Sequence, residues 1–134
     1  MIYRLYDTSV WIDYRKGVFS AQTDQLDQDL LDGMICICPV IIQEILQGIR
    51  IDSDFNQLKK DFQVLQILVT DPVKAAIDAA IIYRNLRKKG VTIRKSNDCL
   101  IAAYALHFDV ELCHNDSDFD LIAAHTALKV WKPS

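Results

Sequence analysis

The sequence predicts an α/β fold, a three-layer α/β/α sandwich in which helices cover both faces of a mainly parallel sheet. Short apolar runs alternate along the chain with longer segments that repeat apolar residues at helical spacing. No repeat, low-complexity tract or linker rich in proline and glycine divides the 134 residues, a length that suits one domain. We therefore expect a single domain over residues 1–134.

The first half of the chain predicts two strands and four helices. Gly17 and Gly33 end predicted helices, and Pro39 stands at a plausible first helical position. In chain order we expect a strand at 2–6, a helix capped by Thr8 or Ser9, a helix at 21–31, a strand at 34–37, a helix from 39 to about 48 and a polar helix at 53–62.

The second half predicts a long helix that Asp71 and Pro72 open, followed by a helix that is apolar nearly all round and should therefore be central. The apolar stretch before the long helix suits a strand or an extended connector. The expected ranges are the stretch at 64–70, helices at 71–90 and 96–108, a strand at 110–115, a short helix at 117–125 and a last strand at 128–131.

Composition excludes several classes of protein. Hydrophobic residues make up 51% of the chain and charged residues 25%, which argues against disorder. No apolar run approaches the ~20 residues that span a bilayer, so we expect a cytoplasmic protein without a membrane segment. A zinc site is disfavoured because one residue separates Cys36 from Cys38, and buried free thiols are expected.

Four acids stand where the chain should leave its sheet: Asp7, Glu44, Asp98 and Asp116. The carboxyl ends of parallel strands meet at one edge, so these side chains should converge on one crevice. Two carboxylates ~5 Å apart repel each other by roughly 3 kcal/mol at an effective dielectric of about 20. Such a cluster needs protons or a cation, and oxygen ligands favour Mg²⁺ or Mn²⁺.

A simpler interpretation is that some of these acids only cap helices. Asp7, Asp98 and Asp116 all stand near predicted helix starts, where the helix dipole favours a negative charge. Glu44 escapes this explanation, because it lies inside a predicted helix among isoleucines and needs a partner there. The set of four acids therefore favours a divalent-metal site.

Four segments carry a resemblance that covers nearly the whole chain: LYDTSVWID at 5–13, PVIIQEILQG at 39–48, SNDCLIAA at 96–103 and HNDSDF at 114–119. In this order they resemble PIN-domain ribonucleases, specifically the VapC-type toxins of bacterial toxin–antitoxin pairs. The resemblance implies a PIN-like fold.

Residue roles follow from the resemblance, position by position. Asp7, Glu44, Asp98 and Asp116 match the metal-binding acids of the family, and Asp118 falls where some relatives have an auxiliary acid. Thr8 or Ser9 would hydrogen-bond Asp7 or a water of the site, and Asn115 would orient the neighbouring acid. Arg94 and Lys95 end a basic run beside Asp98 and are candidates for RNA phosphate contacts, although a solvated helix end explains them as well.

The resemblance implies a Mg²⁺- or Mn²⁺-dependent endoribonuclease that hydrolyses RNA through a metal-activated water. No histidine is expected as general base, because His107, His114 and His125 lack mutual ligand spacing and strand alternation directs His114 away from Asn115. The resemblance also implies a cognate VapB-type antitoxin, a homodimer, and transfer or ribosomal RNA as substrate. The alternative is a catalytically weak PIN domain that binds RNA or serves as a scaffold. A nuclease acting on DNA is less consistent with the chain, which lacks the extra helical segments of such enzymes.

Two other enzyme classes are excluded by the residues after the first strand. A phosphoaspartyl enzyme of the haloacid dehalogenase type needs an acid two positions after Asp7, where Ser9 stands. Nucleotide-phosphate binding would need a glycine-rich loop at the same place, and none is present.

Overall fold

The central sheet consists of short parallel strands in the order β3-β2-β1-β4. The computed structural model describes residues 2–134, and its strands are β1 (Arg4–Tyr6), β2 (Ile35–Ile37), β3 (Gln66–Ile67) and β4 (Glu111–Cys113). In the middle of the sheet, Leu5 of β1 lies between Cys36 of β2 and Leu112 of β4. The predicted parallel α/β sheet is confirmed.

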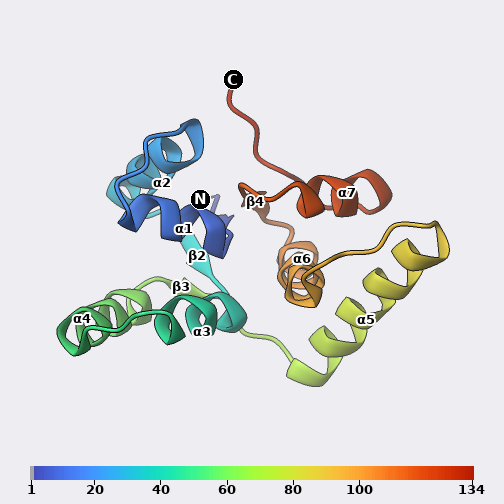
Figure 1. The fold of residues 1–134 in the computed structure, drawn as a ribbon, viewed down its shortest axis with the longest axis horizontal. Coiled ribbons are helices and arrows are strands. Elements are labelled where there is room, and N and C mark those ends of the chain that lie inside the picture. The colour runs from blue at the N-terminus through green and yellow to red at the C-terminus, as the bar shows by residue number, and fades with distance from the viewer. Residues whose placement is uncertain (1) are drawn as a thin grey trace.

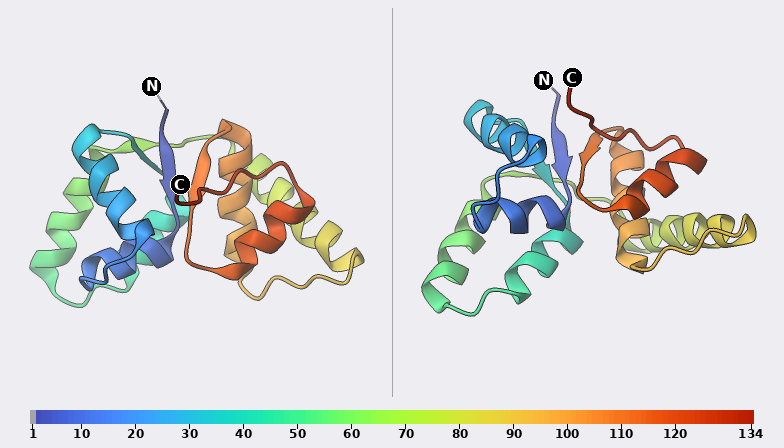
Figure 2. Two further views of the ribbon diagram at one scale, coloured as in Figure 1. Left: turned by 90° about the horizontal axis from the view of Figure 1, so that it is seen from above. Right: turned by 45° about the horizontal axis from the view of Figure 1, so that its top comes forward.

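Helices cover both faces of this sheet (Figures 1 and 2). One side carries α1 (Thr8–Arg15), α2 (Ala21–Asp32), α3 (Pro39–Gln47) and α4 (Asp52–Gln63), and the other carries α5 (Pro72–Lys88), α6 (Ser96–Phe108) and α7 (Ser117–His125). Right-handed crossovers explain this arrangement. The chain adds β2 and β3 in one direction from β1, so the connecting helices lie on one face of the sheet. It then adds β4 on the other side of β1, so the helices before β4 lie on the opposite face. The three-layer sandwich is therefore confirmed.

Helix α6 is the most deeply buried helix, as its apolar composition predicted. Its side chains from Cys99 to Ala105 are buried except for Leu100, which is half-buried. The helix packs against α3, α5 and α7 and against β4. This central position carries its first turn, with Asp98, to the carboxyl edge of the sheet.

Two local predictions were wrong. The predicted strand at 128–131 is reduced to one bridge, in which Val130 pairs with Leu112 of β4 through two backbone hydrogen bonds. A single paired residue is too little for a ladder. The cap of α1 is Asp7 rather than Thr8 or Ser9, because Asp7 has extended backbone angles and its carboxylate accepts the Ser9 N–H.

Two further observations concern the whole of residues 2–134. All four cysteines are buried and free, and burial raises the pKa of the Cys36 thiol to about 12. No helix within these residues is long and apolar enough to cross a membrane.

Candidate metal centre

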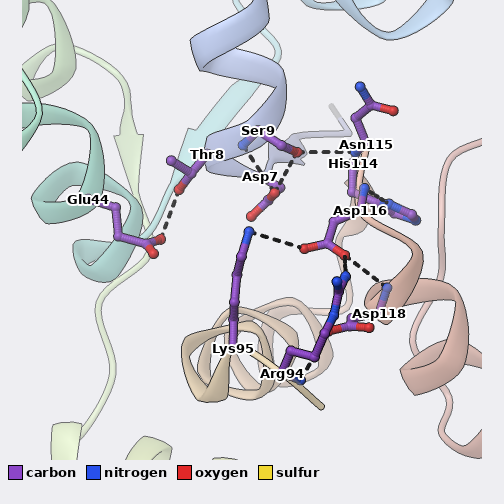
Figure 3. A network of polar contacts seen from close by, with 10 residues as sticks. All are labelled: Asp7, Thr8, Ser9, Glu44, Arg94, Lys95, His114, Asn115, Asp116 and Asp118. Atoms are coloured by element: carbon purple, nitrogen blue, oxygen red, sulfur yellow. Dashed lines mark hydrogen bonds and ion pairs between the residues drawn. The ribbon is translucent and has the colours of Figure 1, made fainter.

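Acidic side chains from separate elements gather at the carboxyl edge of the sheet (Figure 3). Asp7 directly follows β1, and Asp116 lies in the loop after β4, the neighbouring parallel strand. Asp98 comes from the first turn of α6, and Glu44 from α3. The convergence expected from parallel strand ends therefore occurs, and helices on both faces of the sheet contribute to it.

Asp98 is the most unusual of these acids. It is 4% exposed, and no group in residues 2–134 donates a hydrogen bond to its Oδ2. One oxygen each from Asp98, Asp116 and Asp118 lie within 4.8 Å of one another. Burial, followed by the charges of Asp7 and Asp116, raises the pKa of Asp98 to about 8. At neutral pH and without a cation, this carboxyl therefore mostly carries a proton.

Asp7 is also buried, but it has partners. Its Oδ2 accepts hydrogen bonds from the backbone N–H of Ser9 at 3.1 Å and from the Ser9 hydroxyl at 2.6 Å. Burial nevertheless raises the pKa of Asp7; the hydrogen bonds from Ser9 oppose this shift, and the charge of Glu44 adds to it.

Asp116 is stabilised in its charged form. Burial disfavours its ionisation, but the Asp118 N–H, which donates to Asp116 Oδ1 at 3.0 Å, and the nearby ammonium of Lys95 outweigh burial and lower the pKa of Asp116. The Lys95 Nζ lies 3.6 Å from Asp116 Oδ2. The guanidinium of Arg94 also approaches, with Nη2 at 3.8 Å from Asp116 Oδ1.

Asp118, which the resemblance gives as an auxiliary acid, lies in the same cluster as Asp98 and Asp116. It is buried, and its Oδ2 accepts the backbone N–H of Arg94 at 3.1 Å. The Arg94 Nε lies 3.5 Å from the same oxygen. Arg94 and Lys95 themselves are exposed, so their side chains are free to contact a solvent-borne ligand.

Glu44, on α3, lines the site together with Asp7 and Asp98. Its Oε1 accepts a hydrogen bond from the Thr8 hydroxyl at 2.9 Å. A hollow of about 330 Å³ lies between this pair and the other acids, and its lining includes Asp7, Glu44, Lys95 and Asp98. Asp98 thus belongs both to this hollow and to the cluster with Asp116 and Asp118.

The predicted supporting residues fall into two groups. Ser9 hydrogen-bonds Asp7 as expected, whereas the Thr8 hydroxyl donates to Glu44 rather than to Asp7. Asn115 does not orient Asp116, because its amide donates to Asp13 Oδ2 at 3.0 Å on the other side of the loop. Asp13 is distant from Asn115 in the chain, so the sequence did not indicate this contact.

Sequence reasoning missed His114. Its Nδ1 accepts the backbone N–H of Asp116 at 3.0 Å, so it makes the contact to Asp116 that was expected of Asn115. Strand alternation indicated that His114 points away from Asn115, but nothing in the pattern showed which group it meets.

The donor set fits a hard divalent cation. It consists of carboxylate oxygens, which Mg²⁺ and Mn²⁺ prefer, with no thiolate or imidazole among the converging ligands. A buried carboxylate oxygen without a hydrogen bond is the feature that a cation would satisfy.

Comparison with known proteins gives the family. The PIN domain model matches residues 4–125. The chain belongs to the PIN-domain family.

Relatives of this PIN domain include VapC ribonuclease Mb1587 of Mycobacterium bovis and ribonuclease VapC11 of Mycobacterium tuberculosis. Each is 36% identical over 127 residues, which cover 93% of this chain and 95% of the relative. The resemblance to VapC-type PIN-domain ribonucleases is confirmed, and with it the prediction of an enzyme.

Solved structures of lower identity share the fold. The VapBC complex of Salmonella typhimurium bound to DNA matches with a TM-score of 0.75 at 18% identity, covering 98% of both chains. VapBC2 of Rickettsia felis bound to a promoter fragment matches with a TM-score of 0.72 at 20% identity, covering 98% of this chain and 100% of the other.

Proposed function

We propose that this PIN domain is a Mg²⁺- or Mn²⁺-dependent endoribonuclease and the toxin of a toxin–antitoxin pair. The observation that carries the proposal is Asp98, a buried carboxylate with an unsatisfied oxygen among other acids. The 36% identity to VapC ribonucleases supports RNA as the substrate.

In this proposal Asp7, Glu44, Asp98 and Asp116 hold the cation, with Asp118 as an auxiliary ligand. When bound, the cation would supply an activated water and stabilise charge on the phosphate and the leaving oxygen. The Ser9 hydroxyl and N–H keep Asp7 Oδ2 in place, and the Thr8 hydroxyl orients Glu44. Without the cation, the proton on the Asp98 carboxyl relieves the repulsion between the acids.

Arg94 and Lys95 are the proposed contacts to RNA phosphates. Both are exposed and lie within 4 Å of Asp116 or Asp118, which places their positive charges beside the proposed metal ligands. Such contacts are salt-sensitive, because bound phosphates release counterions. Transfer or ribosomal RNA remains the predicted substrate.

A VapB-type antitoxin and a second copy of this chain are the proposed protein partners, in the cytoplasm. Apolar side chains that remain exposed support such interfaces. Phe19, just before α2, is 93% exposed, and Leu31, within α2, is 78% exposed. Helix α5 exposes a stripe of Val73, Ile77 and Ile81.

The test is cleavage of a total small-RNA pool by the purified protein, freed of any antitoxin, in Mg²⁺, in Mn²⁺ and in EDTA. We expect discrete fragments only with metal, and none from Asp98→Asn. Asp78→Asn on α5 is the matched control, because it changes the same residue type away from the site. Binding of RNA without fragments in any metal would contradict the nuclease and favour the alternative, an RNA-binding module.

A further inference from the structure

His114 lies at the end of β4, where the chain turns toward Asp116, and both of its ring nitrogens have partners. The Nδ1 atom accepts the Asp116 N–H at 3.0 Å, and Nε2 lies 3.2 Å from Asp120 Oδ1. The ring is buried and packs against Phe119 with its centroid 5.2 Å away. Figure 3 shows the ring directed toward the backbone at Asp116.

We propose that His114 is a positioning residue that sets the place of the Asp116 carboxylate, and thereby the affinity of the site for Mg²⁺. The proposal rests on the proposed function, because it takes Asp116 to be a metal ligand. His114 itself contacts no proposed ligand oxygen: its role is to hold the backbone that carries one.

The hydrogen bonds assign the tautomer of His114. An atom that accepts an N–H carries no proton, so Nδ1 is bare and the ring proton is on Nε2. Nε2 then donates to Asp120 Oδ1, which also lies 3.0 Å from Lys132 Nζ.

The backbone of Asp116 needs this support because of its place in the fold. Asp116 is the N-cap of α7 with extended angles, φ −139° and ψ 119°, so its N–H lies outside the helix ladder. His114 holds that N–H, while Asp116 Oδ1 accepts the Asp118 N–H. With the N–H and one carboxylate oxygen held, Oδ2 is directed toward Lys95.

The residue between them is held independently. The Asn115 N–H donates to Ser9 Oγ at 3.2 Å, and its amide donates to Asp13. A change at His114 therefore leaves the loop attached to α1 and acts mainly on Asp116.

Three substitutions separate the two ring contacts. In His114→Asn the amide oxygen falls near the place of Nδ1 and still accepts the Asp116 N–H, whereas His114→Gln reaches the place of Nε2 and leaves that N–H without its acceptor. His114→Phe removes both contacts and keeps the packing on Phe119. We expect His114→Asn to bind Mg²⁺ within about 3-fold of wild type, and the other two to bind about 10- to 100-fold more weakly.

The measurement is Mg²⁺ affinity by calorimetry on the full chain, with circular dichroism to confirm that each variant is folded. Cleavage at increasing Mg²⁺ should show the same weakening as a higher half-saturating concentration, with the rate at saturation nearly retained. A purely structural role would lower the folded fraction without this order among the variants. Equal Mg²⁺ affinity in wild type and folded His114→Gln would overturn the inference alone, whereas a wild type that binds no Mg²⁺ would overturn the proposed function as well.

A spectroscopic test needs neither metal nor variant. In ¹⁵N-labelled wild-type protein, we expect His114 to show the Nε2–H tautomer and a scalar coupling across the hydrogen bond between its Nδ1 and the Asp116 amide nitrogen. A proton on Nδ1 would contradict the contact on which the inference rests.

Discussion

Two aspartates of this protein are equally buried and have opposite surroundings. Asp29 of α2 and Asp98 of α6 are each 4% exposed. Asp29 accepts hydrogen bonds from Arg4 Nη1, from the Tyr6 hydroxyl at 2.6 Å and from Gln25 Nε2. Asp98 has an oxygen that accepts none in the described chain, and its charged neighbours include Asp7 and Asp116.

The difference teaches that burial of a charge does not by itself mark a functional site. Arg4 and Tyr6 stand two residues apart on β1, so both point to the face of the sheet that carries α2, and they satisfy Asp29 there. Burial, followed by the hydrogen bond to Asp29, raises the pKa of the Tyr6 hydroxyl. The Asp29 cluster is satisfied by hydrogen bonds and by Arg4, whereas Asp98 Oδ2 accepts no hydrogen bond in the described chain and lies among other carboxylates.

The largest expected effect is on catalysis. Asp98→Asn should lower metal-dependent cleavage by about 10³-fold or more, because the cation would lose a central ligand and each tenfold corresponds to about 1.4 kcal/mol of activation free energy. Single-turnover cleavage at saturating RNA measures it. Asp29→Asn serves as the comparison and should retain the wild-type rate per folded molecule; equal losses in both would contradict the distinction between the two aspartates.

The same two substitutions should shift stability in opposite directions. Asp29→Asn removes the charge that balances Arg4 and should cost about 2 to 3 kcal/mol of unfolding free energy, or about 10 °C in Tm. Asp98→Asn removes a carboxyl that must either take up a proton or lie charged beside Asp7 and Asp116, so at neutral pH without metal its Tm should rise by a few degrees. Thermal unfolding in EDTA measures both, and a lower Tm for Asp98→Asn would be inconsistent with repulsion at the empty site.

The pH dependence of stability follows from the pKa of Asp98, about 8 in the folded protein against an ordinary value of 3.8. Between these values the folded protein keeps a proton that the unfolded chain has released, so the free energy of unfolding falls as pH rises. The contribution is complete below pH 3.8 and lost above about pH 8. Urea unfolding in EDTA should show a free energy of unfolding about 3 to 4 kcal/mol lower at pH 8 than at pH 5. This loss should be smaller in Asp98→Asn and the same as wild type in Asp78→Asn.

Thr8→Val tests whether the hydrogen bond from Thr8 to Glu44 contributes to the Mg²⁺ affinity of the site. It keeps the shape of Thr8 and removes the hydroxyl that donates to Glu44. We expect Mg²⁺ affinity to fall about 10-fold, within the usual range for residues that orient a ligand. Calorimetric titration measures the change, with Thr70→Val, which lies near His107 and away from the acids, as the control.

The smallest expected effect concerns the exposed cations. Lys95→Ala should reduce the dependence of log Kd for RNA on log salt concentration by about 1, because one phosphate contact is lost. Lys60→Ala on α4 should leave the slope unchanged. Filter binding with RNA in Ca²⁺ across several salt concentrations measures both, and equal slopes in wild type and Lys95→Ala would remove Lys95 from the RNA surface.

Local signals explain why most elements could be predicted. Gly33 ends α2 in a left-handed conformation, and Pro39 stands at the first position of α3, so each boundary depends on one residue and its neighbours. The sequence shows apolar residues at helical spacing along α5, but it does not show which of them face the core. The residues that α5 packs inward include Ala75 and Leu86, and Val73, Ile77 and Ile81 remain exposed.

The sequence by itself determined that Asp7 and Asp116 meet at one edge, because both follow parallel strands whose carboxyl ends lie side by side. Only the tertiary structure decided the partner of each side chain. Asn115 contacts Asp13 across more than a hundred residues of chain, His114 holds Asp116, and Asp98 is left without a donor. Hydrogen bonds depend on separations of tenths of an ångström between atoms of distant segments, and no local pattern of residues encodes those separations.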